Sequence, residues 1–158
     1  MTPFATPRHA IDPVVDLSIG VDTSEARRAS TWLGEAGSAR GIPAEPLWRL
    51  DLCVTEALAN VIAHGGAGTG SSTIRLRLDV RRGASGGEAS VTVSDAGIKY
   101  DPLTAPLKAR PRTLADAEPG GQGLTMLRKF SDALDYAYSE GRNHLTIRVR
   151  WDQDKAAP

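Results

Sequence analysis

Residues 74–80, IRLRLDV, alternate apolar and charged side chains, a pattern that fits only a strand with one buried face. Residues 89–95, ASVTVSD, repeat the alternation after the glycine-rich segment 83–87, GASGG, which predicts a hairpin between them. Two such strands require a sheet that is covered on one side. The positions expected to face the covered side are Ile74, Leu76, Leu78, Val80, Val91 and Val93.

Helical periodicity precedes these strands. After a short strand near residues 17–21, the sequence DTS at 22–24 offers an N-cap to a helix that extends to about residue 39. A second helix follows Pro43 and Pro46, which are tolerated in a first turn, and ends at His64.

The last third of the chain predicts one more helix and two closing strands. Residues 123–132, GLTMLRKFSD, have helical spacing, and 133–139 and 143–151 have the alternation of strands. This order of elements predicts an α+β two-layer sandwich, with helices covering one face of a mostly antiparallel mixed sheet. We expect a flexible arm over 1–15, one domain over 16–152 and a tail over 153–158.

Composition narrows the class of protein. A length of 158 residues with 41% apolar residues suits one core. Nineteen basic residues balance nineteen acidic ones, so the overall positive charge of a nucleic-acid binder is missing. This balance does not exclude a local basic patch. One cysteine, Cys53, excludes an internal disulfide and suits a reducing compartment. With no signal peptide or membrane-length apolar run in the sequence, we expect a cytoplasmic protein without membrane contact.

The second predicted helix carries a polar pair. The sequence VTEALANVIAH spaces Glu56 and Asn60 four residues apart, so their side chains are neighbours on one face. The pair either belongs to a solvated face together with Arg49 or forms the wall of a site. Small and apolar neighbours make this polar face thin, which is typical of a site wall; they are Leu52, Cys53, Ala59 and Ala63.

Asp95 is the second candidate residue. The alternation that directs Val91 and Val93 inward also directs Asp95 inward, where a carboxylate needs a donor. Two explanations stay open: a turn closed by the backbone of the following AGIK, or a ligand contact. Gly97 would permit close approach of a ligand or of backbone.

The third candidate is the glycine cluster GGQGL at 120–124, immediately before the last predicted helix. Glycines there let exposed N–H groups approach an anion, which the helix dipole also favours, but such a cluster is also often only a turn. The sequence is neither a Walker A loop nor a dinucleotide fingerprint. A second cluster, 65–70, follows a helix and is expected to be a flexible link.

The sequence contains these motifs in a fixed order: E-x-x-x-N, D-x-G, a long loop and G-x-G-L. This ordered set resembles the nucleotide-binding (Bergerat) domain shared by histidine kinases, gyrase, a heat-shock chaperone and mismatch-repair proteins. Four longer segments more narrowly resemble the bacterial anti-sigma-factor serine-protein kinases. They are EALANVIAH, VSDAGIKYDP, GGQGLTMLRKFSDALDY and GRNHLTIRVR. The resemblance covers about residues 15–151, with a lid loop at about 98–122.

The resemblance implies ATP and Mg²⁺ as cofactors and assigns roles to residues of this chain. Glu56 would be the general base, Asn60 would place its amide oxygen on Mg²⁺, and Asp95 would accept a hydrogen bond from the adenine amino group. The base would lie against Gly97, and the phosphates would contact Gly121, Gly123 and Leu124. His64 occupies a position that is often His in these kinases, or is simply a helix C-terminal His favoured by the dipole.

This chain also departs from the family pattern. Lys99 replaces the usual second glycine after Asp95, and the segment DAEP at 116–119 lacks the basic residue that several relatives carry. Three basic residues earlier in the loop either substitute for it or are solvated; they are Lys108, Arg110 and Arg112.

The partners implied by the resemblance are an alternative sigma factor, which such proteins sequester, and an antagonist protein that they phosphorylate on Ser or Thr. A homodimer is also implied, and no direct contact with nucleic acid. Two alternatives remain: a nucleotide-binding or sigma-binding module that transfers no phosphate, and a detached ATPase half of a histidine kinase. The presence of both Glu56 and Asn60 favours the kinase.

Overall fold

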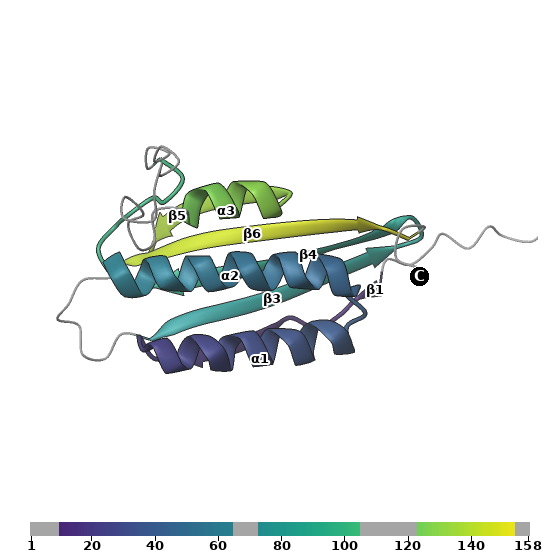
Figure 1. Cartoon of the computed structure of the whole chain (residues 1–158), viewed down its shortest axis with the longest axis horizontal. Coiled ribbons are helices and arrows are strands. Elements are labelled where there is room, and N and C mark those ends of the chain that lie inside the picture. The colour runs from purple at the N-terminus through teal and green to yellow at the C-terminus, as the bar shows by residue number, and fades with distance from the viewer. Residues whose placement is uncertain (1–9, 65–72, 105–122, 154–158) are drawn as a thin grey trace, which may run out of the picture.

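A computed structural model describes residues 10–64, 73–104 and 123–153 of the chain (Figure 1). Apart from β1, the helices and strands follow the order expected from the sequence. The elements are β1 (Ala10–Ile11), β2 (Val15–Ile19), α1 (Thr23–Ala39), α2 (Ala44–His64), β3 (Ile74–Gly83), β4 (Gly86–Asp95), α3 (Gly123–Phe130), β5 (Ala133–Ser139) and β6 (Arg142–Asp152).

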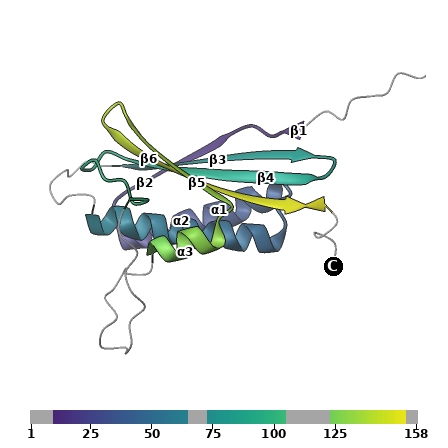
Figure 2. The ribbon, with the colours of Figure 1, turned by 90° about the horizontal axis from the view of Figure 1, so that it is seen from above.

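The strands form one sheet in the order β1-β3-β4-β6-β5, and β2 pairs with β3 on the same edge as β1. Every pairing among the described strands is antiparallel, so the sheet shows no mixed character there. The three helices lie together on one face of the sheet (Figure 2). The expected α+β two-layer sandwich is therefore confirmed.

The core lies between the helices and the inward face of the sheet. Ile74, Leu76 and Leu78 of β3 are fully buried, whereas the arginines between them are exposed on the opposite face. Leu76 pairs with Val93 across the β3–β4 hairpin, so the apolar positions of both strands face the same helices. Leu50, Val54 and Leu58 of α2 are buried against them. Within the described ranges, no helix is both long and apolar enough to span a membrane.

The ends of the helices follow local chemistry. The side chain of Asp22 accepts a hydrogen bond from Ser24 N at 3.2 Å and caps α1, as predicted. Helix α3 ends at Phe130, two residues earlier than expected. The reason is that the backbone N–H of Asp132 donates to Arg148 O at 2.8 Å and so already belongs to the pairing with β6.

Strand β1 was not expected from the sequence. Strand β1 lies inside the expected N-terminal arm, where Ala10 and Ile11 pair with Arg82 and Arg81 of β3. A two-residue strand has too few positions to show an alternation, because the period of a strand is itself two.

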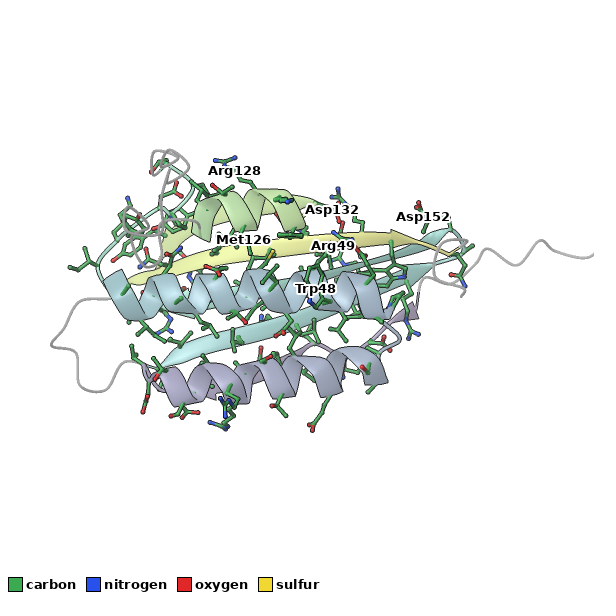
Figure 3. The ribbon with its side chains drawn as sticks, in the orientation of Figure 1. Trp48, Arg49, Met126, Arg128, Asp132 and Asp152 are labelled. Atoms are coloured by element: carbon green, nitrogen blue, oxygen red, sulfur yellow. The ribbon has the colours of Figure 1, made fainter. Side chains whose placement is uncertain are left out.

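Of the two interpretations of the polar face of α2, a solvated face is wrong for Arg49. Its side chain is only 17% exposed and reaches from α2 toward Asp132, just after α3 (Figure 3). The guanidinium donates to the carbonyl oxygens of Phe130 and Arg150 and to the carboxylate of Asp132, each at 3.1 Å. Arg49 thus joins α2 to the end of α3 and to β6, a use that the planar fork of donors permits.

Candidate functional site

A cleft opens between α2, the carboxyl end of β4, the start of β6 and the loop that follows β4. It encloses about 460 Å³, the space open to solvent included. Most of its lining is apolar, with a few polar groups, which is the usual character of a small-molecule site. The lining residues are Ala57, Asn60, Val61, Val93, Asp95, Ile98, Tyr100, Pro102, Tyr136, Asn143 and Leu145.

Asp95 lies inward at the end of β4, as predicted, and is 9% exposed. Its Oδ1 accepts a hydrogen bond from Gly97 N at 2.9 Å, so the turn with the following backbone is real. The same oxygen accepts from Asn143 Nδ2 at 3.2 Å. The two explanations weighed for Asp95 are therefore compatible: the carboxylate closes a turn and also lines the cleft.

Sequence reasoning missed Asn143, the residue opposite Asp95 in the β4–β6 register. It is 6% exposed and makes four hydrogen bonds. Besides donating to Asp95, its Nδ2 donates to Ile98 O at 2.9 Å, while its Oδ1 accepts from Tyr100 N at 3.0 Å and from the Tyr136 hydroxyl. A signal existed, because Asn143 is in phase with the buried Leu145 and Ile147.

Glu56 and Asn60 lie where α2 meets the start of α3. Both are half-buried. Gly123, the first residue of α3, is buried beside them: a Cβ placed on it would lie 3.4 Å from Oε2 of Glu56 and 3.6 Å from both Oδ1 and Nδ2 of Asn60. The structure therefore brings together the polar pair of α2 and the last glycine of the cluster.

Other candidate residues have different positions. Leu124 is half-buried in the first turn of α3. Lys99 extends over the ring of Tyr138 at 5.4 Å, so its cation contacts the face of an aromatic ring. Gly121 lies outside the described residues, as do 105–122 of the expected lid, with Lys108, Arg110, Arg112 and DAEP. His64 is the last residue of α2.

The electrostatics of the site favour an anion at the start of α3. This helix has no acidic residue in its first turn and two basic residues, Arg128 and Lys129, in its last. Its N–H groups and dipole therefore present partial positive charge at Gly123. At the other end of the cleft, burial and the nearby carboxylate of Asp101 raise the pKa of Tyr136, which keeps its hydroxyl a donor to Asn143.

The side chains at this place offer oxygen ligands, which suit a hard cation. Among the described residues no group of three or more His, Cys, Asp or Glu side chains could hold an ion. Asn60 supplies one hard amide oxygen, next to the carboxylate of Glu56. Such a set suits Mg²⁺, which keeps several waters and takes further ligands from substrate phosphates.

Comparisons with known proteins agree with this arrangement. Residues 21–149 match the family described as histidine kinase-like ATPase domain. The chain is 35% identical over 131 residues to a serine/threonine-protein kinase, BtrW, of Bordetella bronchiseptica, covering 83% of this chain and 89% of that protein.

Among solved structures, the chain resembles the RsbU and RsbW domains of a Mycobacterium tuberculosis protein. The TM-score is 0.61 at 16% identity, and the match covers 90% of this chain but only 33% of that one, so it concerns the fold. Together, the domain match over most of the chain and the kinase relative establish the family. This chain belongs to the histidine kinase-like ATPase family, and its 35% identical relative is a serine/threonine-protein kinase.

Proposed function

We propose that this protein is an ATP- and Mg²⁺-dependent serine/threonine-protein kinase that also acts as an anti-sigma factor. One observation carries the proposal. Asn60 belongs both to the cleft that Asp95 lines and to the cluster with Glu56 and Gly123. Asn60 would therefore join the proposed adenine-binding end to the proposed phosphate-binding end in one site.

At the adenine end, Asp95 would accept a hydrogen bond from the amino group of the base. Two donors, Gly97 N and Asn143 Nδ2, already contact its Oδ1, so this buried carboxylate has hydrogen-bond partners. The base would lie against Gly97 and the apolar wall of the cleft. Val93, Leu145 and Ile98 belong to that wall.

At the phosphate end, the N–H groups of Gly121, Gly123 and Leu124 would bind the phosphates of ATP. The absence of a side chain on Gly123 supports this role, because it leaves the start of α3 open toward Glu56 and Asn60. Asn60 would hold Mg²⁺ through its amide oxygen. When bound, the ion neutralises charge on the phosphates.

The chemistry assigned to Glu56 is general base catalysis. The hydroxyl oxygen of a substrate Ser or Thr bonds to the γ-phosphorus, the bond from phosphorus to the β–γ bridging oxygen breaks, and ADP leaves. Glu56 accepts the hydroxyl proton. Its position beside both Asn60 and Gly123 supports this role, since the γ-phosphate would be held next to it.

The proposed partners follow from the family. The acceptor hydroxyl would belong to an anti-sigma-factor antagonist protein, and the protein would sequester an alternative sigma factor when that antagonist is phosphorylated. We also propose a homodimer, a cytoplasmic location and no direct contact with nucleic acid. The named kinase relative supports the choice of a protein hydroxyl as acceptor.

Nucleotide binding tests the site. Asp95→Asn places an amide where the carboxylate would meet the adenine amino group, so ATP affinity measured by calorimetry with Mg²⁺ should fall about tenfold or more. Asp51→Asn is the matched control, because Asp51 accepts its hydrogen bond from Ser30 on α1, away from the cleft. Equal ATP affinity in both variants would mean that Asp95 is only a turn residue.

A second candidate is a module that binds nucleotide or a sigma factor and transfers no phosphate. The departure at Lys99 favours it, because a side chain engaged with Tyr138 replaces the glycine usual beside the nucleotide. The two candidates differ in one measurable respect, namely whether an antagonist protein gains phosphate from bound ATP.

A further inference from the structure

The carboxamide of Asn143 is fully occupied by the protein. Its two N–H donors go to Asp95 and to Ile98 O, and its oxygen accepts from Tyr100 N and Tyr136. A carboxamide has two donors and an acceptor oxygen with two lone pairs, so this buried side chain has no unused capacity. It lines the cleft but acts on a ligand only through its neighbours.

The chemistry of those neighbours fixes which way the carboxamide points. The backbone N–H of Tyr100 can only donate, and the carbonyl oxygen of Ile98, on the amino side next to Asp95, can only accept. The oxygen must therefore face Tyr100 and the amino group must face Asp95. Neither a carboxylate nor an apolar side chain at this position could satisfy both groups at once.

This orientation determines how Asp95 faces the cleft. Its Oδ1 receives two donors, Gly97 N and Asn143 Nδ2, and among the described residues no donor contacts Oδ2. The plane of the carboxylate is thereby held, and Oδ2 is left as an acceptor for a ligand. The same Asn143 binds the backbone of Ile98 and Tyr100, so it also holds the adjoining wall of the cleft.

We infer that Asn143 is a positioning residue that gives the cleft its preference for a 6-aminopurine, by fixing Asp95 and the 98–100 backbone. The inference rests on the proposed function, in that the ligand of this cleft is taken to be ATP. A purine with an oxo group at position 6 would place a second acceptor against Asp95 Oδ2. Discrimination between the two purines then depends on how rigidly that oxygen is held.

The test compares ATP with ITP, which carries an oxo group in place of the 6-amino group. Affinities of both are measured by calorimetry with Mg²⁺ for the wild type, Asn143→Ala and Asn143→Asp. The wild type should prefer ATP at least tenfold. Both variants should lose about tenfold or more in ATP affinity and much less in ITP affinity, so the preference should fall to about threefold or below.

Thr146→Val is the matched control, since Thr146 makes a hydrogen bond to Thr92 between the same two strands. It should leave the ATP to ITP ratio unchanged. Should Asn143→Ala fail to fold, the near-isosteric Asn143→Asp retains the shape and still removes the donor to Asp95.

Three results would overturn the inference. Unchanged ATP affinity in a folded Asn143 variant would show that Asp95 needs no positioning. An equal loss of ATP and ITP affinity would show a merely structural role. A wild type that binds neither nucleotide would refute the proposed function itself, and this inference with it.

Discussion

A Cβ on Gly123 would lie 3.4 Å from Oε2 of Glu56, although the two residues come from different helices that are distant in the sequence. That contact joins the glycine cluster to the polar pair of α2. In the proposed site, this position of Gly123 accounts for a poor helix former at the start of α3.

Gly123→Ala should therefore separate stability from function. Ordinary van der Waals contact begins near this distance, and alanine is the better helix former, so unfolding by urea should show stability unchanged within about 0.5 kcal/mol or raised. Phosphoryl transfer should fall about tenfold or more, because the methyl group occupies space next to the phosphates.

Gly34→Ala provides the control for that substitution. Gly34 lies within α1, and nothing lies within 4 Å of a Cβ placed on it. This variant should gain about 0.5–1 kcal/mol of stability and keep full activity. If Gly123→Ala is equally active, the start of α3 does not contact the phosphates.

Arg49 gives a prediction about stability. Arg49→Met keeps most of the apolar stem but removes the donors to Phe130 O, Arg150 O and Asp132, and should lower the free energy of unfolding by about 2 kcal/mol. Arg49→Lys should recover little of this loss, because a single ammonium cannot reach all three acceptors. Urea denaturation measures both, and full recovery with lysine would show that charge alone matters.

Cys53 gives a prediction about pH. Burial raises the pKa of its thiol from an ordinary value of 9.0 to about 11. Because the pKa is raised in the folded state, the free energy of unfolding is unaffected below pH 9 and decreases as the pH rises from 9 to 11. Cys53→Ala has no thiol and lacks this dependence. Between pH 9 and 11 the wild type should therefore lose about 2 kcal/mol of its free energy of unfolding relative to the variant. If the free energy of unfolding of both proteins changes in parallel with pH, the raised pKa of Cys53 is contradicted.

The same burial has a simpler consequence for reactivity. A fully buried thiol with a raised pKa is a poor nucleophile, so a thiol reagent at pH 8 should label Cys53 only after unfolding. Rapid labelling of the native protein, followed by intact mass, would show that the core around α2 opens more readily than its packing indicates.

Much of the fold could be predicted because its signals are local. The alternation in β3 and β4, the cap at Asp22 and the spacing along α2 each depend on a few neighbouring residues. Asp95 could be identified for the same reason, since its phase in β4 directs it inward.

The remaining features depend on packing between segments that are distant in the sequence. The contact of Gly123 with Glu56, and the role of Arg49 as a link between α2 and β6, exist only once the helices lie on the sheet. Asn143 could be predicted only in part. Its phase in β6 marked it as inward, but its partners on β4 and β5 and in the loop after β4 could not be known from its own strand.

In the proposed reaction, ATP held between Asp95 and Gly123 passes its γ-phosphate to a protein hydroxyl, with Glu56 as the base. The most direct measurement is the intact mass of a purified antagonist protein from the same organism after incubation with this protein and Mg²⁺-ATP. We expect a gain of one phosphate with the wild type and none with Glu56→Gln, while both proteins bind ATP within about twofold of each other. No gain with a wild type that binds ATP, or an equal gain with Glu56→Gln, would contradict it.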